Sequence, residues 1–274
     1  MKPKNILVIG ASSGIGYDLV LKLLEQRHNV YCGARRLNKL KPLEDLGARV
    51  YKVDVTKATS VQTIVNAMLV EVGTIDIVYS NAGYPIAGPV ESESICNIQR
   101  QFDVNVYGAA RITQAVLPHM RARGEGRIVF TTSIAARASS SMNAWYSASK
   151  HALSGMAKAL QQEVEGFNIK ISTVEPGCVQ TELPGIQLGD MLDSRRIPAY
   201  KETIKKSHKF LKDAYDKGSD TRSTVNTLIK AGFSKNPKLV YQSTPDAKLM
   251  ALTLRLFGEG VFGSLVSKII SKAA

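Results

Sequence analysis

The sequence has few cysteines, few histidines and no long apolar run, and each shortage excludes a class of protein. Its cysteines are scattered, odd in number and without a CxxC spacing, so we expect reduced thiols rather than a disulfide scaffold: Cys32, Cys96 and Cys178. The four histidines show no ligand spacing with one another or with cysteine, so we predict no metal site. No apolar run reaches the roughly 18 residues of a membrane-spanning helix. The first residues lack the apolar core of a signal peptide, so we expect a cytoplasmic rather than a secreted protein.

Acidic residues are scarce near the C-terminal end. The chain has a net charge of +13, and most of it falls in residues 195–274, where 16 Lys and Arg face only 6 Asp and Glu. Such a segment can attract nucleic acid, an anionic membrane or an acidic ligand. The alternative is a solvated basic surface, which the absence of a nucleic-acid-binding motif favours.

Short runs rich in Val and Ile alternate with helix-length segments over the first 180 residues. The runs are nearly continuously apolar, as expected for parallel strands covered on both faces: Asn5–Ile9, Asn29–Cys32, Arg49–Val53, Ile75–Tyr79, Arg127–Thr131 and Lys170–Val174, with a last strand at Lys238–Tyr241. The helical segments between them are Ile15–Gln26, Lys39–Leu46, Ser60–Val72, Ser94–Arg123 and Trp145–Glu163. This alternation predicts an α/β fold of Rossmann type, a doubly wound parallel sheet of about seven strands with helices on both faces.

Residues 183–222 interrupt this rhythm. They contain two prolines, many charges and no strand pattern, and we expect a helix only over Tyr200–Tyr215. An insertion beyond the carboxyl ends of the strands is a natural substrate cover. Because the sequence shows no repeat or linker, we predict a single domain over residues 1–274.

A glycine-rich turn joins the first predicted strand to the first predicted helix. Its order, Gly10-Ala11-Ser12-Ser13-Gly14-Ile15-Gly16, is a variant of the dinucleotide-binding fingerprint. The first glycine permits the tight turn, the second a close approach of the backbone to a pyrophosphate, and the third close packing of helix on sheet. The helix N-terminus then offers N–H groups and a partial positive charge to the phosphates.

The end of the second strand indicates which dinucleotide binds. A carboxylate at this place binds the ribose 2′-OH of NAD, but here the strand leads into Arg35 and Arg36. Two guanidinium groups suit a 2′-phosphate, so we predict NADP(H) rather than NAD(H). The alternative is that one or both arginines begin the next helix in solvent. Asp54, after the third strand, is placed to meet the adenine, or to cap the following helix.

Tyr146 and Lys150 lie four positions apart in a helical segment, so they share a helix face. A tyrosine has a pKa of about 10. A cation at about 4 Å supplies about 4 kcal/mol at an effective dielectric of 20, which is enough to lower that value by about three units. Together with an oxidised nicotinamide nearby, Lys150 is therefore expected to make Tyr146 a proton carrier near neutral pH. Alone, this spacing also fits a surface tyrosine stacked on a lysine stem.

Other polar residues follow the strands at the same edge of the predicted sheet. Ser133 comes after the fifth strand and can hydrogen-bond a substrate oxygen that gains negative charge, or it can serve as a turn residue. Asn81, Ala82 and Gly83 come after the fourth. Asn105 lies inside a helical run, where asparagine is mildly unfavourable and asks for an explanation.

As a set, these motifs resemble the short-chain dehydrogenase/reductase family over about residues 4–182. The set comprises the glycine turn, Asn81-Ala82-Gly83, Asn105, Ser133, Tyr146, Lys150 and Pro176-Gly177 followed by Thr181. The resemblance implies that Tyr146 exchanges the proton, Lys150 binds the nicotinamide ribose, Ser133 steadies the substrate oxygen and Asn105 holds a water that links Lys150 to solvent. Two positions depart from the family pattern, Ile9 where Thr is usual and Ser80 where Asn is usual.

The resemblance also extends the cofactor site. The cofactor-binding residues that we predict are Gly10, Ser12, Ser13, Gly14, Ile15, Gly16, Arg35, Arg36, Asp54, Val55, Asn81, Ala82, Gly83, Tyr146, Lys150, Pro176, Gly177, Val179 and Thr181. The stretches Gln101–Gly108 and Trp145–Gly155 look like the retinol and hydroxysteroid dehydrogenases, which implies a lipophilic steroid, retinoid or acyl-glycerone substrate. A homodimer or homotetramer is expected from the family.

Residues 245–274 form an amphipathic, basic segment that three glycines interrupt. We expect it to pack beside the substrate entrance or a partner subunit, and the alternative is contact with an anionic membrane surface. Two other functions stay open for the whole chain. One is a catalytically silent, cofactor-binding regulatory protein, and the other is a basic membrane- or nucleic-acid-binding protein on the same fold. Because every chemical position is occupied, we favour the enzyme.

Overall fold

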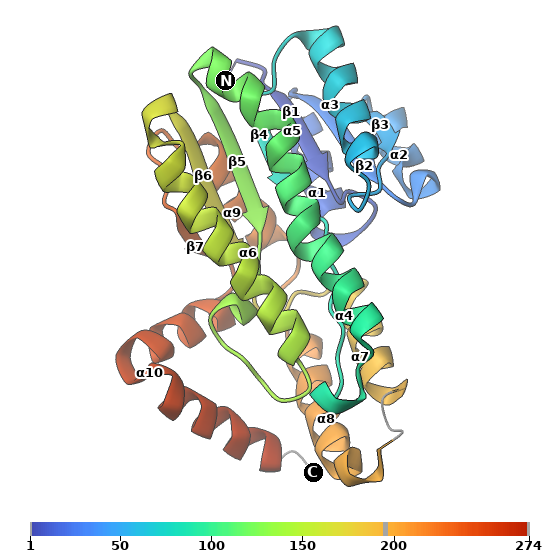
Figure 1. Cartoon of the computed structure of the whole chain (residues 1–274), viewed down its shortest axis with the longest axis vertical. Helices are drawn as coiled ribbons and strands as arrows, with labels where there is room; N and C mark the ends of the chain where they lie inside the picture. Colours follow the sequence, from blue (N-terminus) through green and yellow to red (C-terminus); the bar gives the residue numbers. More distant parts are fainter. Residues whose placement is uncertain (1, 194–196, 273–274) are drawn as a thin grey trace.

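Seven parallel strands form one sheet at the centre of the protein (Figure 1). The computed structural model describes residues 2–193 and 197–272, so parts of the predicted insertion (194–196) and of the C-terminal segment (273–274) lie outside the described residues. The strand order β3-β2-β1-β4-β5-β6-β7 shows that the chain starts in the middle and winds outward in both directions, which confirms the predicted doubly wound sheet. The strands are β1 (Asn5–Ile9), β2 (Asn29–Ala34), β3 (Arg49–Lys52), β4 (Ile77–Ser80), β5 (Gly126–Thr131), β6 (Ile169–Glu175) and β7 (Val240–Gln242).

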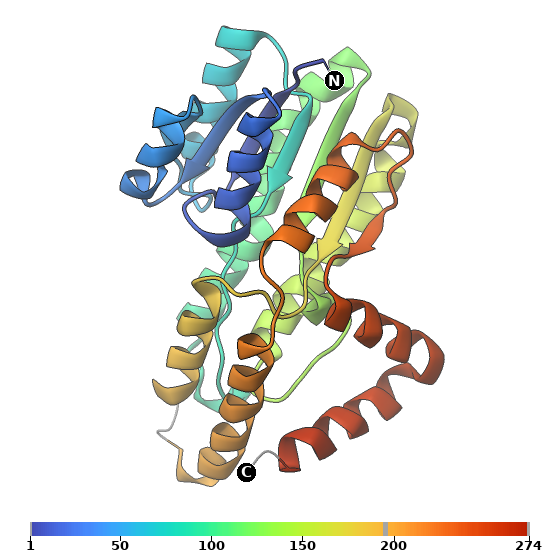
Figure 2. The ribbon, with the colours of Figure 1, turned by 180° about the vertical axis from the view of Figure 1, so that it is seen from behind.

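Helices cover both faces of the sheet because alternate strand side chains point to opposite sides. Leu7 and Ile9 of β1 belong to a buried core under α3 (Ala58–Val72), α5 (Gly108–Arg123) and α6 (Ala144–Glu163). Ile6 and Val8 belong to a second core under α1 (Gly14–Glu25) and α9 (Arg222–Phe233). Figure 1 is seen from the side of α3, α5 and α6, and Figure 2 shows α1 in blue and α9 in orange on the other face.

Two predicted helices differ from a plain α-helix. The segment predicted over Ser94–Arg123 is α4 (Ile95–Phe102), a π-helical turn η3 (Asp103–Tyr107) and then α5. The segment predicted over Lys39–Leu46 is a 3-10 turn η1 (Leu37–Leu40) followed by the short α2 (Lys41–Asp45), which has a proline in its first turn. Further 3-10 turns are η2 (Val90–Ser92), η4 (Ile134–Ala136), η5 (Glu165–Phe167) and η6 (Pro198–Tyr200).

Three helices, α7 (Leu183–Asp193), α8 (Lys201–Asp216) and α10 (Pro245–Lys272), lie beyond the carboxyl ends of the strands and below the sheet in Figure 1. The predicted insertion therefore holds two helices, since α7 precedes the expected one. Met191 of α7 and Ile204 of α8 share a small apolar cluster of their own with Ala87 and Met142. We call α7, α8 and α10 together the cover.

The last helix departs from the sequence prediction in one respect. By length and composition alone, α10 is long and apolar enough to cross a membrane. The sequence shows no unbroken apolar run here because lysines and glycines are interspersed in α10. Gly258, at φ 74° and ψ 174°, is not helical, so α10 is two shorter helices joined at a kink.

Candidate active site

A cavity of about 560 Å³ lies at the carboxyl ends of the central strands and continues under the cover. It sits where the strand order reverses, between β1 and β4, which is the place where open α/β sheets bind ligands. Among the predicted site residues, all but Gly16, Asp54 and Asn105 line this cavity. The strand ends thus bring together side chains that lie far apart in the sequence.

The glycine turn after β1 packs so tightly that two of its glycines admit no side chain. Gly10 has a φ of +97°, and a Cβ there would lie 2.5 Å from the backbone nitrogen of Ala82. A Cβ on Gly16 would collide with the Gly10 carbonyl oxygen. That same oxygen accepts a hydrogen bond of 2.9 Å from the Asn81 Nδ2, so Asn81 holds the turn from the end of β4. The close packing of Gly16 and the hydrogen bond from Asn81 therefore fix the shape of the glycine turn.

The backbone N–H groups in the first turn of α1 are available to a ligand. Its N-cap, Ser13, makes no capping hydrogen bond, and no acidic side chain stands in the first turn. The N-terminal N–H groups of a helix need partners and carry partial positive charge, so this turn suits an anionic group. With the glycine turn and the cavity beside it, these residues fit the pyrophosphate of a dinucleotide.

Arg36 lies across the glycine turn and already holds a carboxylate. Its guanidinium donates to the Ser12 Oγ at 3.1 Å and to the Ser13 Oγ at 2.9 Å. It also pairs with the Glu182 carboxylate at 2.8 Å, and Lys39 stands 3.9 Å from the same carboxylate. The Arg36 guanidinium beside Glu182 helps to hold the pKa of that carboxyl below its usual range. This group of serine, arginine and lysine side chains is therefore an anion site, which Glu182 fills from the loop after β6.

Asp54 does not face the cavity. Its Oδ1 accepts hydrogen bonds from the Thr56 N–H at 3.0 Å and from the Thr56 hydroxyl at 2.8 Å. Burial disfavours its charge, but these bonds outweigh burial and keep the pKa of Asp54 below its usual range. The carboxylate therefore closes the turn before α3, whose N-cap is Lys57.

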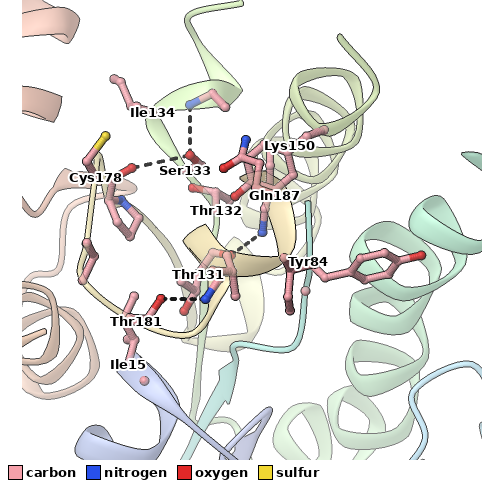
Figure 3. Close-up of a pocket in the computed structure, with 18 of the residues that line it drawn as sticks. Ile15, Tyr84, Thr131, Thr132, Ser133, Ile134, Lys150, Cys178, Thr181 and Gln187 are labelled. Atoms are coloured by element: carbon pink, nitrogen blue, oxygen red, sulfur yellow. Dashed lines mark hydrogen bonds between the residues drawn. The ribbon is translucent and has the colours of Figure 1, made fainter. Parts of the chain in front are cut away.

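Ser133, Tyr146 and Lys150 line the cavity. Figure 3 shows Ser133 and Lys150 away from Ile15, which lies in the first turn of α1. Ser133 follows β5, and its Oγ accepts a hydrogen bond of 3.1 Å from the Ala135 N–H. Tyr146 and Lys150 lie one turn apart in α6. The Lys150 Nζ donates to the Thr131 carbonyl at 3.0 Å and stands 5.7 Å from the centre of the Tyr146 ring. The predicted convergence of hydroxyl, phenol and amine is thus present.

Burial controls the proton affinity of these groups. It raises the pKa of Tyr146 to about 12, against a hydrogen bond with Ser133 that lowers it. It lowers the pKa of Lys150 to about 8. Burial therefore outweighs the neighbouring groups, and the pKa of Tyr146 is raised and not brought toward neutral as the spacing predicted. At neutral pH the phenol keeps its proton, which is the form that can donate to a carbonyl oxygen.

Asn105 lies in the π-helical turn η3, behind the cavity wall. Its Nδ2 donates to the Tyr84 carbonyl at 2.9 Å and to the Ser149 hydroxyl at 3.0 Å, while its Oδ1 accepts from the Tyr84 N–H at 3.0 Å. The environment of Gly83 links Asn105 to Lys150, since a Cβ there would lie 3.2 Å from both the Asn105 Oδ1 and the Lys150 Nζ. Isolated π-helical turns often mark functional sites, and this one brings an amide close to the ammonium.

The loop after β6 completes the wall on the other side. The Gly177 N–H donates to the Thr244 hydroxyl at 2.9 Å, and the Cys178 N–H donates to the Asp246 carboxylate at 2.8 Å. The start of α10 therefore fixes the loop that carries Pro176, Val179 and Thr181 into the cavity.

Sequence reasoning missed a polar row under the cover. The Tyr215 hydroxyl donates to the Gln187 Oε1 at 2.7 Å, and the Gln187 Nε2 donates to the Asn143 Oδ1 at 2.9 Å. All three side chains line the cavity, and Gln187 is buried. They come from α8, α7 and the start of α6, so no spacing in the sequence signals their meeting. Within the described residues, no cluster of three or more His, Cys, Asp or Glu side chains is arranged to hold a metal ion.

Comparisons with known proteins agree with this geometry. The sequence model of the short chain dehydrogenases matches residues 4–187. The chain is 33% identical over 245 residues to the 3-ketodihydrosphingosine reductase of Bacteroides thetaiotaomicron, with 86% of each chain covered. It is 37% identical over 193 residues to retinol dehydrogenase 8 of Bos taurus, which covers 67% of this chain and only 61% of that protein. The structure superposes on a short-chain dehydrogenase from Streptomyces avermitilis with a TM-score of 0.80 and 27% identity, over 99% and 96% of the two chains.

Proposed function

The chain belongs to the short-chain dehydrogenase family of NAD(P)-dependent oxidoreductases, and we propose that it transfers a hydride between NADP(H) and the carbon of a lipophilic carbonyl or alcohol. One observation carries this proposal. Ser133, Tyr146 and Lys150 line the same cavity as the glycine turn and the first turn of α1. A dinucleotide bound along that cavity supplies the hydride or accepts it.

Each polar residue of the site has a task that its position allows. In the direction of reduction, Tyr146 gives its phenolic proton to the substrate oxygen as the carbon gains the hydride. Ser133 hydrogen-bonds the same oxygen and stabilises its growing negative charge. Lys150 binds the nicotinamide ribose and stabilises the phenolate that forms. Asn105, through its contact with Tyr84, holds the wall behind Lys150 and places an amide oxygen where a water can bridge to the ammonium.

Arg35 and Arg36 support the choice of NADP(H). Both line the cavity at its glycine end, and Arg36 already binds an anionic oxygen there. A 2′-phosphate would find the same donors that Glu182 now uses, with charge-assisted bonds from the guanidinium group. Pro176, Gly177, Val179 and Thr181 would hold the nicotinamide end.

The part of the cavity under the cover supports a lipophilic substrate. Apolar side chains from all three cover helices line it, namely Ile186, Leu211, Met250, Phe262 and Val266. Two relatives are named for 3-ketodihydrosphingosine and for retinol, both lipophilic molecules. A steroid, a retinoid, an acyl-glycerone or a long-chain ketone fits this setting, and the polar row of Gln187 and Tyr215 offers a place for a hydroxyl or amine group.

The remaining parts of the proposal concern assembly and location. We propose one domain over residues 1–274, with residues 183–222 as the part of the cover that the sequence predicted to enclose the substrate. We propose that it assembles as a homodimer or homotetramer through α5 and α6. We propose a cytoplasmic protein. A catalytically silent regulatory role is less well supported, because Ser133, Tyr146 and Lys150 all reach the cavity.

The test is a substrate screen with a matched active-site variant. NADPH consumption is followed with steroid, retinoid, acyl-glycerone and small aldehyde substrates. The wild-type protein should consume NADPH with at least one of them, and Tyr146→Phe should lower turnover by about 10² to 10⁴-fold. NADPH binding by the variant, followed by the fluorescence of the coenzyme, should be unchanged. Turnover by Tyr146→Phe at the wild-type rate would remove the proposed role.

A further inference from the structure

α10 carries a stripe of exposed apolar side chains on each of its halves. Leu249, Leu252 and Leu256 are 65%, 53% and 64% exposed. Beyond the kink, Val261, Leu265 and Ile269 are 55%, 48% and 45% exposed. Spacings of three and four residues place each set on one side of its helix half. Helices of water-soluble proteins bury such stripes, so this surface is unusual.

The side of the same helix next to these stripes belongs to the cavity. Met250, Phe262 and Val266 line the space under the cover, and Phe262 is buried. α10 therefore carries apolar side chains that line the cavity and, next to them, apolar side chains that are exposed to solvent.

Cations border the exposed stripes. Lys248 and Arg255 directly precede Leu249 and Leu256, and Lys268 directly precedes Ile269. Among the described residues, none of these three cations takes part in an ion pair. Long basic side chains beside an apolar stripe can extend their charges to the level of lipid phosphates while the stripe enters the lipid.

The cover carries further positive charge next to α10. The Lys206 Nζ of α8 donates to the Ser271 carbonyl at 2.8 Å, which joins α8 to the end of α10. Lys201 and Lys205 lie on the same α8 and are exposed. Of the two acidic residues of α10, Asp246 is engaged with the Cys178 N–H, so Glu259 is the one that faces solvent. α8 and α10 together therefore expose more cations than anions, which suits an anionic surface.

The kink at Gly258 indicates that α10 lies on a bilayer and does not cross it. Figures 1 and 2 both show α10 as two arms that meet at an angle and turn back toward α8. Each arm holds about 14 residues and is about 20 Å long at about 1.5 Å per residue. That is shorter than the roughly 30 Å of a hydrocarbon core. Two short arms with exposed stripes suit the interface of a bilayer.

We infer that the outer face of α10 docks on an anionic lipid surface and that the cavity side of the same helix receives the lipophilic substrate from that surface. The docking stands on the exposed stripes and the charge, and only the delivery of substrate rests on the proposed function. A second copy of the chain is a poorer occupant. A two-fold contact through α10 would bring the Lys248 and Arg255 of one copy toward those of the other.

Sedimentation with vesicles tests the docking on the full-length protein. Vesicles of phosphatidylcholine alone are compared with vesicles that also contain phosphatidylglycerol, at low and at high salt. We expect the protein to pellet with the anionic vesicles at low salt and to be released by high salt, with little binding to the neutral vesicles. Equal binding to both vesicles would contradict a charge-dependent dock, and pelleting that resists high salt would indicate an inserted α10 instead.

Matched variants locate the contact. Leu252→Gln with Leu256→Gln and Leu265→Gln removes apolar side chains that do not line the cavity, and should reduce vesicle binding by about tenfold or more. The control is Val70→Gln, a side chain of α3 that is 89% exposed, and it should bind as the wild type does. If the leucine variant bound vesicles normally but changed the mass of the protein in light scattering, α10 would be an interface between copies and the inference would fall.

A second pair of variants tests the charge. Lys248→Gln with Arg255→Gln should weaken binding to anionic vesicles and reduce its salt dependence. The control, Lys52→Gln with Lys235→Gln, exposed on β3 and after α9, should change neither. NADPH turnover with a small water-soluble carbonyl is measured for every variant and should stay at the wild-type rate. Loss of vesicle binding with intact turnover would show that the docking of α10 is independent of catalysis. Absence of turnover in the wild type would refute the proposed function but would leave the docking of α10 on lipid unaffected.

Discussion

At the carboxyl edge of the sheet, Asn81, Asn105 and Lys150 each donate a hydrogen bond to a backbone carbonyl. On α10 of the cover, Lys248 and Leu252 are instead exposed to solvent. The sheet edge is buried and close to neutral in charge, and the cover is basic and partly exposed. The difference indicates that the sheet edge and the cover have different tasks. Hydride transfer needs groups that are already in place, and a cover that admits a lipophilic substrate needs apolar surface and freedom to open.

The largest expected effect comes from the sheet edge. Lys150→Ala removes the cation beside the phenol and should lower kcat/KM by at least about 100-fold. In the wild type, burial lowers the pKa of Lys150 to about 8, so the ammonium loses its proton as the pH rises through that value. We therefore expect the rate of carbonyl reduction to fall above pH 8. Lys150→Arg keeps its charge and should lack this limb of the pH profile, and the same limb in both proteins would show that another group titrates.

The same lowered pKa has a consequence for stability. Between pH 8 and the usual lysine pKa, the unfolded chain binds a proton at Lys150 that the folded protein does not bind. This group therefore makes the free energy of unfolding rise with pH in that window. In thermal unfolding, the stability of the wild type relative to Lys150→Met should therefore increase from pH 7 to pH 9.

The second effect lies at the glycine end of the cavity. Arg35→Ala with Arg36→Ala removes charge-assisted bonds worth about 1.5–3 kcal/mol each, so NADPH affinity should fall by roughly a hundredfold or more. NADH affinity should change little. Coenzyme fluorescence titrations of both coenzymes measure this, with Arg121→Ala on α5 as the control. An unchanged ratio of the two dissociation constants would contradict the assignment of a 2′-phosphate to these arginines.

The cover should show a smaller and more selective effect. Phe210 of α8 lines the cavity, and Phe210→Ala removes apolar contact worth about 1.5–3 kcal/mol to a substrate that reaches it. KM for a long-chain carbonyl should rise about tenfold or more, while kcat/KM for a small aldehyde should stay constant. Equal losses for both substrates would mean that the variant disturbs the sheet edge and that the two regions do not divide the work.

The smallest expected effect comes from the ion pair of Glu182 with Arg36, which connects the cover to the sheet edge. Glu182 reaches from the loop before α7 to Arg36, where it occupies donors that a 2′-phosphate would use. Exposed ion pairs contribute about 0–1 kcal/mol, so Glu182→Gln should tighten NADPH binding by up to about fivefold. NADH binding and the control Glu163→Gln should not change. Weaker NADPH binding would show instead that the carboxylate helps to hold the coenzyme.

The sequence predicted the sheet edge better than the cover, for physical reasons. Strands buried on both faces read as apolar runs, and Gly10, Tyr146 and Lys150 follow or face those strands at family spacing. α7 was missed because Pro184, Gly185 and Gly189 look like a loop, although proline is tolerated in the first turn of a helix.

Contacts between distant segments could not be predicted either. The turn of Lys150 to the Thr131 carbonyl, the pairing of Glu182 with Arg36 and the row from Tyr215 to Asn143 depend on how loops fold over the sheet. The π-helical turn at Asn105 was hidden in a pattern that reads as one long helix. The unfavourable place of an asparagine inside that helix was the one available signal.

The transfer of isotope from the coenzyme tests the central claim most directly. NADPH that carries deuterium at C4 of the nicotinamide is incubated with the protein and a reducible carbonyl, and the alcohol is analysed by mass spectrometry. We predict deuterium at the former carbonyl carbon with the wild type, and formation of this labelled alcohol about 10² to 10⁴-fold more slowly with Tyr146→Phe. An alcohol that forms without deuterium from either face of the nicotinamide, or labelled alcohol formed by the variant at the wild-type rate, would contradict direct hydride transfer with Tyr146 as the proton donor.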